Sequence, residues 1–156
     1  MTAYRGVAAR IRLAQIDLQH VAERTTRLMD KLDETHDADF IDGIALNLHA
    51  FYTGAEHVFE AIARDVDGAV PSGPEWHREL LLQVSGGVAD IRPAVVGAET
   101  RACLDAYRGF RHVVRNAYTF TLDGARVREL AAGLPACCEQ LAADLTAFAV
   151  FLDTVG

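Results

Sequence analysis

One short stretch of the chain gathers side chains that could bind and cleave a phosphodiester. Residues 108–120 read RGFRHVVRNAYTF and hold three arginines, Arg108, Arg111 and Arg115, together with a histidine and a tyrosine. The whole chain has a formal net charge of −7, so a basic cluster stands out against it. Arginine can stabilise the charge that develops on a phosphoryl group, and imidazole can move a proton. The stretch is therefore either a solvated or salt-bridged helix face or a site for an anion.

On a helix the three arginines fall on one side, which we call the arginine face (Arg108, Arg111 and Arg115). At about 100° per residue, Arg115 lies about 40° and Arg108 about 60° from Arg111. Cations three and four residues apart repel each other by a few tenths of a kcal/mol, so acids of another helix or an anionic ligand should offset the repulsion. The other polar residues lie on or beside this side of the helix: His112, Asn116 and Tyr118. The apolar residues lie on the opposite side: Phe110, Val113, Val114 and Ala117.

The rest of the chain predicts the helices that must position this face. Apolar residues recur at helical spacing over about residues 3–33, 41–67, 74–84 and 97–119, and from Asp123 to the C-terminus. No alternating run is long enough for a strand. We therefore predict an all-α fold, an up-and-down helical bundle of four long helices plus one short helix, in a single domain over residues 1–156.

Several residues are suited to capping these helices. Asp37 or Asp39 can cap the second helix, and Asp123 can cap the last. Ser72 followed by Glu75 has the spacing of a capping box, with Pro74 in the first turn of the short helix.

Composition and cysteine usage point to a globular cytoplasmic protein. Apolar residues make up 51% of the chain and charged residues 24%, an ordinary globular balance. Cys103, Cys137 and Cys138 do not make a disulfide framework, and we expect buried thiols in a reducing cytosol. The N-terminus does not read as a signal peptide, and no apolar run approaches eighteen residues, so no membrane partner is expected.

We expect neither a metal nor another cofactor. Four histidines show no ligand spacing with cysteines or acids: His20, His36, His49 and His57. The chain also lacks a glycine-rich phosphate loop, so it should not itself be a nucleotidyltransferase.

Two further pairs of residues lie on the predicted second and third helices. Tyr52 and Glu56 are four residues apart beside an apolar face, and they form either a hydrogen-bonded boundary pair or a support in which Glu56 orients the arginine face. Trp76 and His77 open the short helix. We expect Trp76 in the core and His77 at the surface or capping the helix, with a place near the site as the alternative.

In these segments the sequence resembles HEPN-domain proteins of the HepT-like kind, the toxin half of HEPN/MNT toxin–antitoxin pairs. Those proteins carry an Arg-x4-His-x-Tyr motif on a late helix of an all-α bundle. Here Arg111 and Tyr118 match the motif Arg and Tyr, and Asn116 stands where the motif has His. The resemblance covers about residues 40–125, because further segments follow in the same order: FYTGAEHVFEAIARDVDG (51–68), PSGPEWHRELL (71–81) and IRPAVV (91–96).

The resemblance implies a metal-independent endoribonuclease that acts as a homodimer, with the two motif helices facing each other across the interface. It also implies an MNT-type nucleotidyltransferase antitoxin as partner, which in related pairs transfers AMP to the motif Tyr, here Tyr118. Negative charge at Tyr118 would block an RNA phosphate from the arginine face. The implied roles are catalysis for Arg111, Asn116 and His112; RNA binding for Arg108 and Arg115; modification for Tyr118; and support for Tyr52 and Glu56.

Asn116 is the departure from the family pattern. An amide can hydrogen-bond a phosphate or a ribose hydroxyl, but it cannot move a proton near neutral pH. Three outcomes stay open: a weakened ribonuclease, a catalytically inactive HEPN-like binding or interaction module, or a branch in which Asn116 is functional and His112 does the proton chemistry. A purely structural helical dimer is a further class.

Overall fold

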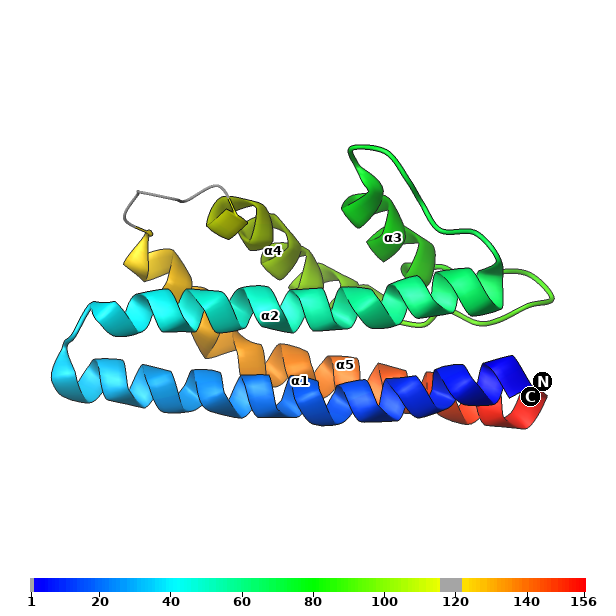
Figure 1. Ribbon diagram of the computed structural model, residues 1–156, viewed down its shortest axis with the longest axis horizontal. Coiled ribbons are helices and arrows are strands. Elements are labelled where there is room, and N and C mark those ends of the chain that lie inside the picture. The colour runs from blue at the N-terminus through cyan, green and yellow to red at the C-terminus, as the bar shows by residue number, and fades with distance from the viewer. Residues whose placement is uncertain (1, 116–121) are drawn as a thin grey trace.

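A computed structural model describes residues 2–115 and 122–156 of the chain (Figure 1). In these residues it contains no strand, and its one bridge of strand type joins Val88 to Arg92. Four long helices and one short helix make up the fold, which confirms the predicted all-α bundle. The helices are α1 (Thr2–Thr35), α2 (Asp39–Ile62), α3 (Trp76–Ser85), α4 (Ala98–Arg115) and α5 (Gly124–Val155), and a π-helical turn, η1 (Ala63–Asp67), extends α2.

The helices pack around α2, which contacts each of the others. Helices α1 and α2 run antiparallel, and α5 returns along α1, so the two ends of the chain lie at the same end of the bundle (Figure 1). Helices α3 and α4 contact each other and both pack on α2, on the side away from α1. The short helix α3 is thus an insertion between the second and third long helices of the bundle.

The apolar stripe of α2 is the centre of the core. Phe51 packs edge-on against Tyr107 of α4, with ring centroids 5.6 Å apart. Phe110 is also buried, as the helical wheel predicts for the side of α4 opposite the arginine face. The largest fully buried side chains of α2 are Ile44, Leu48, Phe51, Tyr52, Phe59 and Ile62.

Helix α5 is the one helix in the described parts of the chain that is long and apolar enough to span a membrane, judged by length and composition. Much of its apolar character serves the core, since Val127, Leu134, Leu141 and Leu145 are completely buried. A core helix meets the same criterion as a membrane span, so this observation is weak evidence for a membrane. The absence of a membrane segment therefore stays a prediction.

The helix ends follow the sequence signals in part. The side chain of Asp123 accepts hydrogen bonds from the backbone amides of Ala125 and Arg126, as a cap should. Asp37 accepts one from the amide of Asp39 at 2.9 Å, but Ala38 is the N-cap residue of α2 and has no side-chain cap, so the cap expected from Asp37 or Asp39 is wrong. The capping box predicted for Ser72 and Glu75 is wrong. A turn with a left-handed glycine at position 73 (φ 99°) carries the chain past Pro74, so α3 begins only at Trp76.

The cysteine prediction is also wrong in one respect. Cys103 of α4 and Cys137 of α5 form a disulfide, with Cα atoms 5.9 Å apart, and Cys138 remains a buried free thiol. The partners lie 34 residues apart on different helices, so their spacing along the chain gave no sign of the pairing. The expectation of a reducing compartment was based on free thiols, and the disulfide removes that basis. A cytoplasmic location stays a prediction.

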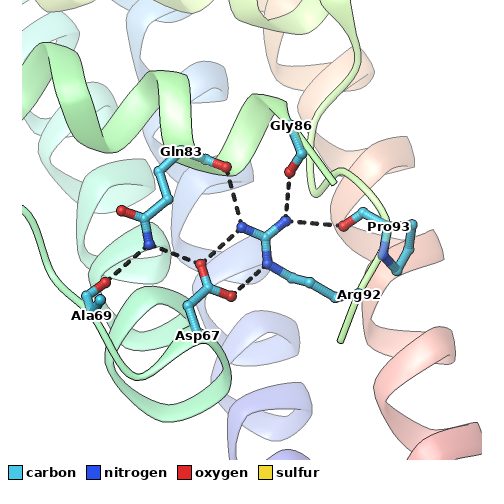
Figure 2. Close-up of polar contacts among 6 residues, drawn as sticks. All are labelled: Asp67, Ala69, Gln83, Gly86, Arg92 and Pro93. Carbon is cyan, nitrogen blue, oxygen red and sulfur yellow. Dashed lines mark hydrogen bonds and ion pairs between the residues drawn. The ribbon is translucent and has the colours of Figure 1, made fainter. Parts of the chain in front are cut away.

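A buried arginine fixes the segment between α3 and α4 (Figure 2). The Arg92 guanidinium binds the Asp67 carboxylate through Nε at 2.6 Å and Nη2 at 2.8 Å. Nη1 donates to the carbonyls of Gly86 at 2.8 Å and Pro93 at 3.0 Å, and Nη2 donates to Gln83 at 3.1 Å. Every N–H of the guanidinium thus has a partner. The Arg92 side chain is fully buried and that of Asp67 is 6% exposed, so the charges depend on each other rather than on water.

Asp67 reaches Arg92 because α2 ends in the π-helical turn. The turn closes at Gly68, whose left-handed backbone (φ 78°) suits glycine, and its end agrees with the predicted end near Asp67 and Gly68. Gln83 of α3 adds a second link, because its side-chain amide donates to Asp67 at 2.8 Å and to the carbonyl of Ala69 at 2.9 Å.

Replacing Arg92 should destabilise the protein strongly. Arg92→Ala leaves the Asp67 carboxylate and three carbonyls buried without their partner, which should lower the free energy of unfolding by about 3–5 kcal/mol. Urea denaturation followed by circular dichroism measures the loss. The matched control is Arg12→Ala, which breaks an ion pair to Asp153 between half-exposed side chains and should cost about 0–1 kcal/mol. Equal losses in the two variants would contradict the structural role of Arg92.

Candidate functional site

A hollow of about 580 Å³ lies between the start of α3 and the C-terminal half of α4. Residues 73–78 form one wall, and Arg108, Gly109 and Arg111 form the other. Two arginines of the predicted arginine face therefore border a cavity rather than a flat helix surface. We refer to this cavity as the arginine pocket.

Three side chains from three helices are joined at the wall of the pocket. Arg111 of α4 lies with Nη1 3.0 Å from Nε2 and 3.3 Å from Nδ1 of His77, the second residue of α3. Nδ1 of the same imidazole lies 2.7 Å from Oε2 of Glu56 on α2. The Glu56 side chain is only 2% exposed, whereas that of His77 is 21% exposed. The imidazole thus connects a buried carboxylate to an arginine that borders the pocket.

The contact with Glu56 assigns one proton on the imidazole. A carboxylate accepts hydrogen bonds, so Nδ1 of His77 carries a proton and donates it to Oε2 of Glu56. Nη1 of Arg111 is near both ring nitrogens, so it lies against the ring and does not single out one of them as its acceptor. Nε2 is therefore the ring nitrogen that Glu56 does not hold.

The imidazole is also held from the side. The rings of Trp76 and His77 lie with centroids 3.6 Å apart and planes tilted by 32°. Trp76 is half-buried against the core and also lines the pocket, so the expectation of a core residue holds in part. Stacking and the bond to Glu56 together leave the His77 ring little freedom to turn.

Arg108 has a different environment from Arg111. It donates from Nε to Asp105, three residues earlier on α4, at 2.8 Å, and its side chain is 25% exposed. A second hollow of about 400 Å³ continues beyond Asp105 and is bordered by Arg78 and Arg101. The basic surface therefore extends along the groove between α3 and α4, which the helical wheel of α4 alone could not show.

The contacts of Glu56 decide between the two interpretations of Tyr52 and Glu56, a hydrogen-bonded boundary pair or a support for the arginine face. Glu56 does not bond to Tyr52, because its carboxylate binds His77 and the Tyr52 hydroxyl has no hydrogen-bond partner. The boundary pair is therefore wrong. Glu56 does reach the arginine face, but through His77, for which a place near the site was the alternative to a surface or capping position.

Part of the predicted site lies outside the described residues. Asn116 and Tyr118 fall in the undescribed segment 116–121. The backbone of α4 is described as far as Arg115, but the side chains of His112 and Arg115 are not. The roles expected of these four residues stay predictions.

The sequence matches the HepT-like protein family over residues 43–152. The chain belongs to the HepT-like family. The match spans Glu56, His77, Arg108 and Arg111, the residues that border or support the pocket. No curated protein and no solved structure matches the chain. The resemblance noted in the sequence is thereby confirmed at the level of the family.

In this HepT-like protein two polar groups beside the pocket lack hydrogen-bond partners among the described residues. The Tyr52 side chain is completely buried, and its hydroxyl makes no hydrogen bond to residues 2–115 or 122–156 as far as these are described. Nε of Arg111 is likewise buried without a partner in that part of the chain. Burial raises the pKa of Tyr52 well above its usual value, and the nearby Glu56 carboxylate raises it further. Tyr52 is therefore a neutral hydroxyl under the site.

Removing the Tyr52 hydroxyl should not destabilise the protein. A buried hydroxyl without a partner costs free energy, so Tyr52→Phe should leave the free energy of unfolding unchanged or raise it by up to about 1 kcal/mol. The matched control is Tyr107→Phe, since the buried Tyr107 hydroxyl donates to the Leu130 carbonyl at 2.7 Å. That variant should lose about 1 kcal/mol. Urea denaturation at pH 7 compares them, and a loss in Tyr52→Phe as large as in the control would contradict the unpaired hydroxyl.

The same variant should change the alkaline stability. Above about pH 10 tyrosines of the unfolded chain ionise, whereas the buried Tyr52 keeps its proton because its pKa is raised in the fold. The unfolded state then binds fewer protons, so the free energy of unfolding falls as the pH rises. Tyr107, whose pKa burial raises to about 12, contributes in the same direction. The fall should be shallower in Tyr52→Phe than in the wild type.

Proposed function

We propose that this HepT-like chain is a toxin that acts as a metal-independent endoribonuclease. The observation that carries the proposal is the pocket in which Arg108, Arg111 and the imidazole of His77 meet. The chain as a whole is acidic, so this local set of cations favours a polyanion over a neutral ligand.

The arginines suit the charge that develops during phosphodiester cleavage. Arg111 places Nη1 against His77 and has a buried Nε without a partner among the described residues, so these residues do not satisfy this guanidinium. A phosphate in the pocket would supply the missing acceptor. Arg108 is partly exposed, and its ion pair with the exposed Asp105 is weak because solvent reaches both charges. Arg108 can therefore turn to a neighbouring phosphate at small cost.

The proposal includes a homodimer and a partner. Two motif helices facing each other would combine two arginine faces around one RNA backbone, with Arg115, His112 and Asn116 completing each half. An MNT-type nucleotidyltransferase would control the site by transferring AMP to Tyr118. Support for both parts comes from membership of the HepT-like family and from the match of Arg111 and Tyr118 to its motif.

A binding module without catalysis is the second candidate. Asn116 favours it, because an amide in place of the motif His cannot move a proton near neutral pH. Such a protein would bind RNA in the arginine pocket and leave it intact. The cleavage experiment below separates the two candidates, since only the ribonuclease shortens its RNA.

Arg111→Ala should nearly abolish RNA cleavage. Losing a contact that stabilises the charge of the transition state commonly lowers the rate by about 10²–10³. The assay is cleavage of a fluorescently labelled single-stranded RNA by the purified protein in excess EDTA, with circular dichroism as the check of folding. The matched control is Arg128→Ala, which removes an arginine paired with the exposed Asp33 on another face and should cleave like the wild type.

Three outcomes of this assay would change the proposal. Wild-type binding without cleavage would favour the binding module. Cleavage by Arg111→Ala at the wild-type rate would place the site elsewhere. A strictly monomeric wild type that cleaves, judged by light scattering on the same sample, would remove the dimer from the proposal.

Tyr118 should be the residue that a partner nucleotidyltransferase modifies. After incubation of the protein with that enzyme and ATP, intact-mass analysis should show an adenylyl adduct, and the RNA cleavage rate should fall because the added phosphate puts negative charge by the arginines. Tyr118→Phe should take up no adduct. An adduct on Tyr118→Phe would contradict the assignment, and Tyr52→Phe is the control, since that tyrosine is completely buried.

A further inference from the structure

We propose that His77 is the proton acceptor of the reaction and that the buried Glu56 orients it. This inference rests on the proposed ribonuclease activity and assigns to α3 the chemistry that Asn116 cannot supply. The ligand is a single-stranded RNA whose ribose 2′-hydroxyl lies at Nε2 of His77. Neither residue has the spacing of the arginine face, and the fold joins them to it across three helices.

The first argument is the geometry of the imidazole. Nδ1 is 2.7 Å from the Glu56 carboxylate, and Nη1 of Arg111 lies against the ring, 3.0 Å from Nε2 and 3.3 Å from Nδ1. The carboxylate holds a proton on Nδ1, so Nε2 is the nitrogen left to accept a proton from a ligand in the pocket that His77 lines. A carboxylate behind an imidazole also stabilises the imidazolium that forms when the ring accepts a proton.

The second argument is the cost of placing Glu56 where it is. Its side chain is 2% exposed, and its carboxylate binds His77, which lies on the rim of a cavity. A buried carboxylate whose main partner is a titratable ring is a costly way to hold two helices together. Asp67 and Arg92 show the alternative in the same protein, since there an arginine with a fixed charge uses all its donors on protein atoms. The pair of Glu56 and His77 instead leaves one ring nitrogen for the pocket.

The third argument is the position of Arg111 beside the ring. When a phosphate enters the pocket, the Arg111 guanidinium can turn from the His77 ring to the phosphate oxygens, which are the stronger acceptors. This movement uncovers the ring at the moment the RNA backbone lies beside it. One residue thus binds the phosphate, and its neighbour receives the proton.

The proton transfer can be written as a balanced step. Nε2 of His77 takes the proton of the 2′-hydroxyl as the 2′-oxygen forms a bond to phosphorus. The bond from phosphorus to the 5′-oxygen breaks, and the departing 5′-oxygen takes a proton from water. The products are a 2′,3′-cyclic phosphate and a 5′-hydroxyl, and the imidazolium afterwards releases its proton to solvent. No oxidation or reduction occurs.

Charged groups face the ring from each neighbouring helix. Glu56 lies on α2, and Arg111 and Arg108 lie on α4, with Asp105 paired to Arg108. Glu75 and Arg78 flank the ring on its own segment. Because these charges are of both signs, the test below uses chemical rescue instead of a pH profile as its decisive measurement.

The test compares His77→Ala with the wild type in the RNA cleavage assay. Loss of a proton acceptor should lower kcat by about 10²–10⁴, while the KM and the affinity for a 2′-O-methyl RNA that cannot be cleaved should change less than about threefold. Added imidazole should restore part of the kcat of His77→Ala, which a merely structural histidine would not allow. The matched control is His57→Ala, an exposed histidine on the outer side of α2, and it should match the wild type.

Glu56→Gln tests the positioning residue. The amide can still accept the bond from Nδ1 but carries no charge, so kcat should fall with KM unchanged, and imidazole should not restore it. In the double variant of His77→Ala and Glu56→Gln the losses should not add, because Glu56 acts through His77. Should His77→Ala fail to fold, His77→Gln, which keeps a polar side chain of similar length, takes its place.

The outcomes separate this inference from the proposed function. A wild type that binds RNA but never cleaves it overturns the ribonuclease and this inference with it. A wild type that cleaves while a folded His77→Ala has the same kcat overturns only the role of His77. A loss in His77→Ala confined to RNA affinity, or one that imidazole does not relieve, overturns it as well.

Discussion

Two buried carboxylates on one helix determine where the short helix α3 lies. Glu56 of α2 binds His77 at the start of α3, and Asp67, in the π-helical turn that extends α2, binds Gln83 near its end and Arg92 beyond it. Both carboxylates are almost completely buried, so each depends on its partner for the stabilisation that water would otherwise give. A helix of ten residues has little stability of its own. Together with the burial of Leu80, Leu81 and Val84, these two contacts place α3 against α2.

The position of α3 in turn decides what the arginines of α4 can do. Without α3, Arg108 and Arg111 would be a solvated stripe on an amphipathic helix. With it, they border a cavity, and Arg111 gains the imidazole of His77 as neighbour. The disulfide between Cys103 and Cys137 joins α4 to α5 on its other side. The pocket is therefore a product of the packing of three helices, and changes that loosen the contact of α3 with α2 should disturb it without touching an arginine.

Sequence periodicity was sufficient for the bundle and for one wall of the pocket. The stripe of Ile44, Leu48, Phe51 and Phe59 and the burial of Phe110 follow from a spacing of 3.6 residues, because a helix must bury its apolar face wherever it packs. Contacts between helices do not repeat along the sequence. Asp67 meets Arg92 across 25 residues, and His77 meets Arg111 across 34, after turns whose geometry the sequence does not fix. The capping box failed for a similar reason, since a left-handed turn at Gly73 delayed the helix.

The same reasoning explains why a motif search alone undervalues this site. A motif records residues that share one helix, and in this chain Asn116 breaks it at the position expected to move protons. Chemistry, however, requires only that an imidazole reach the phosphodiester beside the arginine, whichever helix carries it. His77 meets that requirement from α3, where the only sign in the sequence is a histidine after a tryptophan in the first turn of a short helix. What distinguishes it is the pairing of a buried acid with one ring nitrogen while the other faces a cavity, and that arrangement exists only once the helices have packed.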